Sequence, residues 1–331
     1  MTMHVLAPGR VNLIGDHTDY TGGLVFPMAI DRYTEVRGAP GGERVHLTSI
    51  DEPDPVDLPL VIDRPQDVSP AWGKYVAGVV AELNPAHGFA GRVTTDIPIG
   101  AGLSSSAALE VAVALALGFE GSPLELAQLC QRAENRASGV PSGIMDQLAI
   151  AAGVAGHALL IDCGELSVMP VPVPTDVEVV VQFIEHRTLV GSPYAERVAE
   201  CAAAEAVIGP LRHATVEQAA AIADPVVRAR AMHVTSENQR VRDFAAALVT
   251  GNMADAGELM VQSHRSLRDL YATSTPVMDA AVETLLAMPG VFGARMTGGG
   301  FGGCVVALTE PAVLRSGWVV RAVDGAAVVA R

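Results

Sequence analysis

Short apolar runs separated by glycine, proline and charged residues dominate the first hundred residues, a pattern typical of strands joined by turns. The run at 5–7 ends at Pro8-Gly9, which predicts a strand followed by a turn. The run at 24–30 predicts a strand interrupted at Pro27, because proline cannot donate a ladder hydrogen bond. The remaining predicted strands of this part are a meander at 31–62 and a strand at 89–96.

Helical patterns alternate with these strands from residue 72 onward. Apolar residues at positions 76, 79, 80 and 83 predict a helix that buries one face. Ser122, Pro123 and Glu125 predict another helix start, since serine caps the N-terminus and proline fits the first turn. The predicted helices are 72–83, 122–135, one opening at 192–197, 202–249 with breaks near Gly209-Pro210 and Asp224-Pro225, 253–270 and 278–288. Later strands are predicted at 156–163, 177–183 (interior to a sheet) and 305–308, and an interdomain crossing at 168–174.

A glycine-rich bend at 98–103 leads into Ser104, Ser105 and Ser106 and then into an apolar helix. Serine is a favoured N-cap, so the helix is expected to start within these three serines. Free N–H groups and the helix dipole make such a start an anion site, and glycines let the backbone approach phosphate closely. The alternative is a plain turn before a buried helix. No Walker A lysine follows the glycines.

Closely spaced donors and acceptors occupy residues 10–23, where Asp16 and Asp19 flank His17 near Arg10. Such a set suits a polyhydroxylated ligand, because each sugar hydroxyl both donates and accepts a hydrogen bond. A metal site and a solvated turn remain alternatives on these residues alone.

Two more carboxylates and a second glycine run are further candidates. Glu134 lies near the end of a predicted helix, where a solvated carboxylate is the alternative. Asp146 lies three residues after Gly143 among apolar neighbours, where a carboxylate is poorly hydrated unless it is paired, and a helix-capping role is the alternative. The glycines at 298–303, interrupted only by Phe301, permit close approach to a ligand or another loop.

Composition narrows the classes of partner. The 331 residues are half hydrophobic, enough for one two-domain enzyme or two small domains. The formal net charge of −15 argues against nucleic acid or an anionic membrane as the main partner, although backbone amides and local arginines can still serve a phosphate. The N-terminus lacks a basic region followed by a long apolar stretch, and apolar runs are too short to span a bilayer, so a soluble cytoplasmic protein is expected. The four separated cysteines, which predict neither a metal cluster nor a disulfide framework, are Cys130, Cys163, Cys201 and Cys304.

Three motifs together resemble the GHMP small-molecule kinase family, and within it the galactokinases. They are PGRVNLIGDHTDY at 8–20, PIGAGLSSSAA at 98–108 and RMTGGGFGGC at 295–304. GIMDQ at 143–147 resembles the segment that carries the family's catalytic aspartate, and 187–190 with Ser192 and Tyr194 resembles another galactokinase segment. The first motif is the most specific to galactokinases, and the other two mark the wider family.

The resemblance implies an α+β, two-domain GHMP kinase fold with the active site in the cleft between the domains. The N-terminal domain, expected at 1–170, would be ribosomal S5 domain 2-like and carry the sugar signature and the ATP phosphate loop. The C-terminal domain, expected at 171–331, would be ferredoxin-like α+β and carry the glycine motif. The implied reaction is ATP-dependent phosphorylation of the anomeric C1 hydroxyl of α-D-galactose to galactose 1-phosphate, with Mg²⁺ as cofactor. A monomer or weak homo-oligomer is expected.

The resemblance also implies residue roles. Asp146 would face the reacting hydroxyl as general base, and Arg10 beside it would favour the ionised carboxylate or stabilise the transferring charge. Sugar hydroxyls would be bound by Asp16, His17, Asp19, Gly143 and Tyr194. The triphosphate would be held by Gly100, Gly102, Ser104, Ser105 and Ser106. Magnesium would be held by Ser106 and Glu134, since Mg²⁺ needs few protein oxygens besides phosphate and water.

Two departures from the family pattern bear on the sugar. Asp16 stands where the family usually has the longer glutamate, and the chain after Leu308 is abbreviated. A GHMP kinase for another sugar, such as N-acetylgalactosamine or arabinose, is therefore the nearest alternative. A non-catalytic sugar sensor on the same fold is less favoured, because the loop serines, Glu134, Asp146 and Arg10 are all present.

Overall fold

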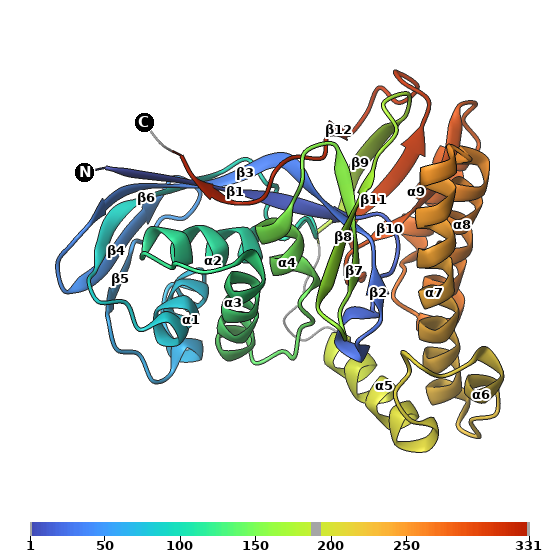
Figure 1. Ribbon diagram of the computed structural model, residues 1–331, viewed down its shortest axis with the longest axis horizontal. Helices are drawn as coiled ribbons and strands as arrows, with labels where there is room; N and C mark the ends of the chain where they lie inside the picture. The colour runs from blue at the N-terminus through green and yellow to red at the C-terminus, as the bar shows by residue number, and fades with distance from the viewer. Residues whose placement is uncertain (1, 187–192, 330–331) are drawn as a thin grey trace.

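The computed structural model describes residues 2–186 and 193–329 (Figure 1). Within these ranges the chain forms three β-sheets covered by helices. The strands are β1 Met3–Asn12, β2 Leu24–Val25, β3 Pro27–Pro40, β4 Arg44–Ser49, β5 Val56–Pro59, β6 Phe89–Thr95, β7 His157–Asp162, β8 Ser167–Pro172, β9 Glu178–Glu185, β10 Val291–Thr297, β11 Gly303–Thr309, β12 Trp318–Val320 and β13 Ala327–Val328. The α-helices are α1 Gly73–Leu83, α2 Ser105–Ala116, α3 Pro123–Ser138, α4 Met145–Ala152, α5 Tyr194–Ile208, α6 Val216–Ala220, α7 Pro225–Thr250, α8 Met253–Ser266 and α9 Pro276–Leu286. Short helical turns are η1 Asp19–Thr21, η2 Pro65–Asp67 and the π-type turn η3 Leu267–Tyr271.

The largest sheet has the strand order β13-β1-β3-β6-β4-β5, and helices α1 to α4 lie along one side of it (Figure 1). Alternating residues of β4 and β5 are buried, which places Val45, Leu47, Val56 and Leu58 in the core. Helix α2 packs against β1 and β3 and is buried nearly all round, as its Ala- and Val-rich sequence requires. The described chain therefore has an N-terminal α+β layer in which α2 lies on strands β1 and β3 of the sheet.

Strand β1 continues through Pro8-Gly9, so the turn predicted there is wrong. The register against β3 shifts at this dipeptide, and the strand then runs on to Asn12. A Cβ at Gly9 would lie 2.9 Å from the Leu103 carbonyl, and Arg10 N donates to that same carbonyl at 3.2 Å. Glycine at this position lets β1 pass against the glycine-rich bend at 98–103, which brings Arg10 beside that bend.

The second half of the described chain is built on the sheet β10-β11-β9-β12, packed against α8 and α9 (Figure 1). Strand β9 is interior, as its apolar run predicts, and every residue of β11 is buried. Residues 168–174 do not form a simple crossing, because β8 pairs with β7 in the small sheet β2-β7-β8. The chain returns at its end to the first sheet, where β13 pairs with β1.

Local capping explains several element ends. Ser122 and Glu125 form the predicted capping box at the start of α3. The breaks predicted near Gly209 and Asp224 are the end of α5 and the N-cap of α7. The predicted start at Ser192 lies outside the described residues.

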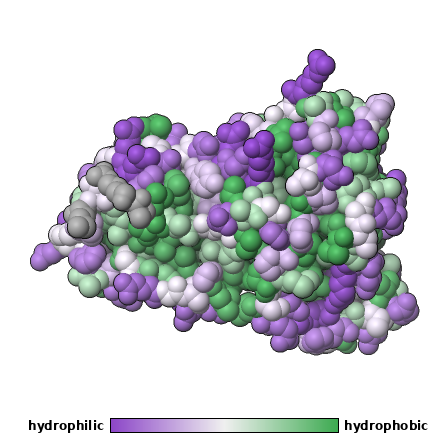
Figure 2. All heavy atoms as spheres, turned by 45° about the horizontal axis from the view of Figure 1, so that its top comes forward, coloured by the Kyte–Doolittle hydropathy of each residue, from purple (hydrophilic) through white to green (hydrophobic). Residues whose placement is uncertain are grey.

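On the face shown in Figure 2, hydrophilic and hydrophobic residues are interspersed. Among the described residues there is no helix with the length and apolar character to cross a membrane.

Candidate active site

An arginine, an aspartate and a serine from three distant segments converge at the start of α2. Arg10 on β1 donates from Nε to Asp146 Oδ1 at 2.7 Å, and its Nη2 lies 2.7 Å from the same oxygen. Ser104 Oγ donates to the other carboxylate oxygen, Oδ2. Arg10 is 2% exposed, whereas 27% of the Asp146 side chain is accessible. The carboxylate is thus fixed by a buried cation and still reachable from outside.

The glycine-rich bend has the backbone geometry that an anion site needs. Gly100 and Gly102 have φ of 76° and 78°, a region that glycine enters without strain. Arg10 Nη1 donates to the Gly102 carbonyl at 2.6 Å and so fixes the bend to β1. A Cβ at Gly303 would lie 3.1 Å from the Ala101 carbonyl, so the two glycine-rich segments lie against each other.

Helix α2 begins at Ser105, within the predicted range, but Ser104 does not cap it with its side chain. Its φ is 62°, and its hydroxyl is turned to Asp146 instead. The side-chain capping expected of a serine here is therefore wrong, because the stronger partner is a charged carboxylate. Asp146 is likewise not an N-cap: it lies in the first turn of α4, whose cap position is Ile144.

Glu134 meets a loop hydroxyl beside this centre. Ser106 Oγ donates to Glu134 Oε1 at 3.3 Å, and Gln147 Nε2 donates to Oε2 at 2.7 Å. Burial, and next the charge of Asp146, raise the pKa of Glu134. Gln147 also donates to the fully buried Glu110 at 3.2 Å, and burial raises the Glu110 pKa well above its usual range. Two oxygens, from one carboxylate and one hydroxyl, converge next to the loop, a donor set that Mg²⁺ accepts when phosphate and water complete its shell.

A cavity of about 390 Å³ lies between η1, α3 and the loop before α4. Asp19 and Gly143 both line it, and a Cβ built on Gly143 would lie 2.0 Å from Asp19 Oδ2. Glycine at 143 therefore leaves the space that the Asp19 carboxylate fills. Burial, and next the nearby charge of Asp146, raise the pKa of Asp19 to about 7. The cavity holds a polar carboxylate close to the Arg10–Asp146 pair. Its lining residues are Asp19, Tyr20, Gly22, Gln128, Gln131, Pro141, Ser142, Gly143, Ile144, Cys163, Leu166 and Val198.

Asp16 is 1% exposed, and both of its carboxylate oxygens lie against protein groups. Oδ1 accepts from Gly298 N at 3.0 Å, and Oδ2 lies 2.6 Å from Nη2 of the fully buried Arg295. Burial raises the pKa of Asp16, and the charge of Arg295 opposes that rise. Asp16 thus joins the segment after β1 to the second glycine run. The expected contact between Asp16 and a sugar hydroxyl stays a prediction.

His17 lies in an aromatic group between the two halves of the chain. Its Nε2 lies 3.2 Å from the Gly299 carbonyl and its Nδ1 lies 3.0 Å from the Tyr20 hydroxyl. Its φ is 65°, in the left-handed region that a residue other than glycine seldom adopts. The Tyr194 ring centroid is 5.5 Å from that of His17 and 5.8 Å from that of Tyr20.

The structure brings most of the sequence-predicted residues to one region. Asp146, Arg10, Ser104 and Gly102 are in direct contact, Ser106 contacts Glu134, and Gly143 contacts Asp19. Segment 187–190 and Ser192 lie outside the described residues. Among the described residues no group of three or more His, Cys, Asp or Glu side chains forms a metal site, so Glu134 with Ser106 is a two-residue candidate.

Sequence reasoning assigned no role to Gln147, Glu110 or Arg295. Glu110 and Arg295 each have apolar residues on both sides, and Gln147 directly follows Asp146; these positions were the available signal. Gln147 joins two carboxylates, and Arg295 is the largest fully buried side chain of the described residues.

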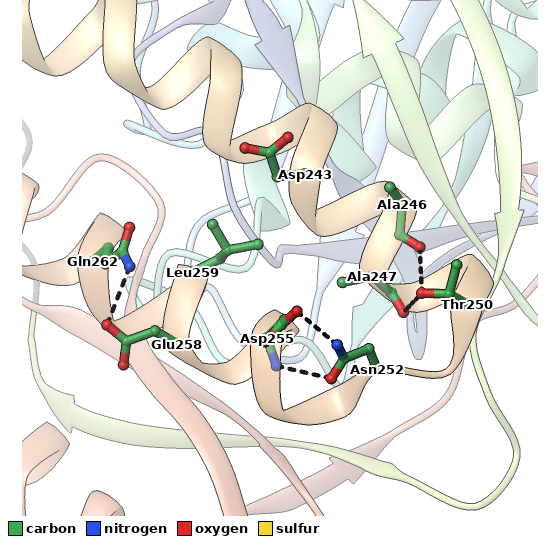
Figure 3. Close-up of a pocket in the computed structure, with 9 residues that line it drawn as sticks. All are labelled: Asp243, Ala246, Ala247, Thr250, Asn252, Asp255, Glu258, Leu259 and Gln262. Carbon is green, nitrogen blue, oxygen red and sulfur yellow. Dashed lines mark hydrogen bonds between the residues drawn. The ribbon is translucent and has the colours of Figure 1, made fainter.

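A second cavity, of about 420 Å³, lies between α7 and α8 (Figure 3). Its lining includes Asp243, Asp255 and Glu258, and Figure 3 shows Asn252 bonded to Asp255 at the turn between the helices. None of the sequence-predicted site residues lines this cavity.

Known families match three parts of the chain. The galactokinase galactose-binding signature matches residues 2–40. The GHMP kinases N terminal domain matches residues 74–154, and the GHMP kinases C terminal domain matches residues 244–315. The matched ranges contain Arg10, Asp19, Asp146 and the second glycine run.

Individual relatives agree with these matches. A galactokinase of Roseiflexus sp. (strain RS-1) is 47% identical over 329 residues, covering 92% of this chain and 83% of that protein. The Homo sapiens galactokinase is 43% identical over 326 residues, with the same two coverages. The crystal structure of Lactococcus lactis galactokinase complexed with galactose has a TM-score of 0.91 at 34% identity, covering 99% of this chain and 95% of that one. A mevalonate kinase structure, with a TM-score of 0.68 at 23% identity over 93% of this chain and 91% of its own, is alike in fold. The chain therefore belongs to the galactokinase family, a branch of the GHMP kinases.

Proposed function

We propose that this protein is an ATP-dependent galactokinase, which transfers the γ-phosphoryl group of ATP to the anomeric C1 hydroxyl of α-D-galactose. The observation that carries the proposal is the fixed Arg10–Asp146–Ser104 contact at the rim of the glycine-rich bend. It places a carboxylate next to an anion-binding helix start, which is the arrangement phosphoryl transfer to a hydroxyl requires. The galactose in the similar Lactococcus lactis structure supports the choice of sugar.

Asp146 is the general base in this proposal. Its Oδ2 accepts a hydroxyl hydrogen bond from Ser104 in the described structure, so the same oxygen can accept one from an incoming sugar hydroxyl. Arg10 holds Oδ1 from the buried side and thereby orients the carboxylate. It also provides positive charge beside the transferring group, which favours the charged transition state.

Sugar recognition is assigned to the cavity lined by Asp19 and Gly143. Asp19 offers a carboxyl group close to Asp146, which accepts hydrogen bonds when ionised and can also donate one when protonated. Tyr194 lies beside the His17 ring. Asp16 and His17 do not line this cavity, and each instead contacts a main-chain group of the second glycine run, Gly298 N or Gly299 O. They complete the sugar set of Asp16, His17, Asp19, Gly143 and Tyr194.

The triphosphate is assigned to the bend and helix start formed by Gly100, Gly102, Ser104, Ser105 and Ser106. Its support is the positive φ of both glycines and the N-terminus of α2. Ser106 and Glu134 are the residues that would hold Mg²⁺. The bound ion supplies positive charge that offsets the phosphate charge. Gln147 and Ser142 orient Glu134 by donating to its other oxygen.

We also propose the domain bounds, the cellular location and the oligomeric state of the active enzyme. Two lobes, 1–170 and 171–331, flank the site, with β13 of the second pairing with β1 of the first. The protein would act in the cytoplasm, where ATP is supplied, as a monomer or weak homo-oligomer. The net charge of −15 disfavours nucleic acid and anionic membranes as partners.

A coupled ADP-release assay with a panel of sugars tests the substrate. Galactose is expected to give turnover in the presence of ATP and Mg²⁺. Turnover with N-acetylgalactosamine or arabinose but not with galactose would replace the proposed function by that of another sugar kinase. This alternative is tested because Asp16, shorter than the family's usual glutamate, contacts Arg295 and Gly298. Binding of galactose without turnover on any sugar would indicate a sensor.

Replacing Asp146 by asparagine tests the assigned base. The asparagine keeps the size of the side chain and a hydrogen-bond acceptor, but it cannot take up a proton, so we expect kcat to fall by about 10²–10⁴-fold. Galactose binding measured by calorimetry should stay within a few-fold of the parent. A variant with near-normal kcat would contradict the role of Asp146. Asp51→Asn, at an exposed site far from this centre in sequence, is the matched control.

A further inference from the structure

The π-type turn η3, Leu267–Tyr271, follows α8 directly and ends the helical run that α8 begins. Ala272 follows it with φ of 53°, and Thr273 N closes the turn on the Leu267 carbonyl at 3.1 Å. Such turns are rare and cost regular helical hydrogen bonds, so they persist where the structure stabilises them by other contacts. The sequence pattern alone predicts uninterrupted helix to residue 270.

Two buried arginines provide those contacts. Arg197 on α5 donates from Nε to the Tyr271 carbonyl at 2.8 Å and from Nη2 to the Ala272 carbonyl at 3.3 Å. Arg230 on α7 donates to the Leu270 carbonyl. Glu200 pairs with both arginines, at 3.0 and 2.7 Å. Three successive carbonyls are thus held by guanidinium groups, and the position of Tyr271 is set by α5 and α7 together.

The Tyr271 side chain is fully buried and lies against the sugar signature. Its ring centroid is 4.7 Å from that of His17 and 4.5 Å from that of His233. Its hydroxyl is 2.5 Å from the Tyr20 hydroxyl and 3.0 Å from Cys201 Sγ. Tyr20 in turn lies 3.0 Å from His17 Nδ1.

These groups form a hydrogen-bond chain with one consistent direction. The Gly299 carbonyl can only accept, so the tautomer of His17 with a single ring proton donates that proton to it from Nε2 and accepts at Nδ1. Tyr20 therefore donates to His17 and accepts from Tyr271, which accepts from the Cys201 thiol. Burial raises the pKa of Tyr20 and of Tyr271 well above the usual range, and that of Cys201 to about 11, so every donor keeps its proton.

The same turn also holds the second glycine run. Phe301 N donates to the Thr273 carbonyl at 2.8 Å. A Cβ at Gly300 would lie 2.4 Å from that carbonyl, so the two backbones are in close contact. One rigid turn is therefore attached to His17 through Tyr271 and to residues 298–303 through Thr273.

We propose that Tyr271 is a positioning residue for sugar binding: its hydroxyl, held in place by the arginine-clamped π-turn, fixes Tyr20 and His17 in the orientation that the sugar requires. Tyr20 lines the cavity assigned to the sugar, so a change in its orientation alters the cavity wall. This proposal rests on the proposed function for the identity of the ligand. It assigns a role to a residue 251 positions away from Tyr20 in the chain.

Tyr271→Phe tests the proposal, because phenylalanine keeps the ring and removes only the hydroxyl. We expect KM for galactose to rise by about 2–10-fold, the range for one lost buried hydrogen bond, with kcat and KM for ATP unchanged within two-fold. Galactose binding without ATP, measured by calorimetry, should weaken by the same factor. Tyr33→Phe, on β3 of the large sheet, is the matched control and should leave all constants unchanged.

A double-mutant cycle with Tyr20→Phe separates positioning from general loosening. If both hydroxyls act through one chain, Tyr20→Phe/Tyr271→Phe should raise KM no more than the larger single change. An unchanged KM for galactose in Tyr271→Phe would overturn the proposal. A fall in kcat and melting temperature together with a rise in KM for ATP would also overturn it, since that pattern indicates a structural role alone. If the parent uses another sugar, the proposed function fails, and the same ratios measured with that sugar still decide the role of Tyr271.

Discussion

Replacing Asp19 by asparagine should stabilise the folded protein, and the gain should increase with pH. Asp19 is a partly buried carboxylate beside Asp146, and burial together with that neighbouring charge raises its pKa from 3.8 to about 7. The fold thus favours the neutral acid. The contribution of Asp19 to stability is fully present below pH 3.8 and is lost as the pH rises through about 7. Asparagine has a similar shape and cannot ionise, so it avoids this loss.

The size of the effect follows from the two pKa values. A difference of one between the folded and unfolded pKa corresponds to about 1.4 kcal/mol of unfolding free energy. The rise from 3.8 to about 7 therefore means that ionising Asp19 costs the folded state at most about 4 kcal/mol. About 2 kcal/mol of this is already lost at pH 5 and about 4 kcal/mol at pH 8. Because the side chain retains contact with solvent, which weakens the effect, we expect the gain from Asp19→Asn to grow by about 1–2 kcal/mol between pH 5 and pH 8.

Thermal unfolding of the parent and of Asp19→Asn at pH 5, 6, 7 and 8 measures this gain. The difference in Tm should widen by about 1–3 °C over the series. Both proteins should be studied without galactose, since ligand binding also shifts Tm. Asp51→Asn, at an exposed position, should show a Tm difference that does not vary with pH.

A Tm difference between parent and Asp19→Asn that is flat from pH 5 to pH 8 would refute the reasoning, because the parent would then carry no ionisation penalty at this site. Destabilisation at every pH would refute it as well. In that case the Asp19 carboxylate would be stabilised by its surroundings in its charged form.

Two further substitutions test the contacts around the site. Gly143→Ala adds a Cβ 2.0 Å from Asp19 Oδ2 at a position where the backbone φ lies outside the left-handed region. We therefore expect displacement of Asp19 and a rise in KM for galactose of about 10-fold or more. Steady-state kinetics with an unchanged KM would contradict the contact. Ser106→Ala removes one of the two oxygens proposed to hold Mg²⁺, so the Mg²⁺ concentration for half-maximal activity should rise several-fold. A metal titration compared with exposed Ser167→Ala checks this, and identical titrations would refute the assignment.

Local physics explains why much of the fold could be predicted from sequence. The capping box at Ser122, the interruption at Pro27 and the helix break at Asp224 depend on residues a few positions apart. The glycine-rich bend was also readable, since Gly100 and Gly102 adopt the positive φ that favours glycine. Strand β8 and the continuation of β1 past Pro8 were not predicted, because proline interrupts both runs and only pairing with another strand, β7 for β8 and β3 for β1, keeps them extended.

The candidate site divides in the same way. The sequence by itself determined the motifs, the family they resemble and the residue types able to bind phosphate and sugar. Only the tertiary structure decided which side chains meet. Ser104 bonds to Asp146 rather than capping α2, Asp16 meets Arg295 across 279 positions, and Gln147 joins Glu110 to Glu134. The physical reason is that a side chain's partner is chosen by the packing of whole elements, here β1 against α2 and α8 against β10, and the sequence near a residue does not contain that information.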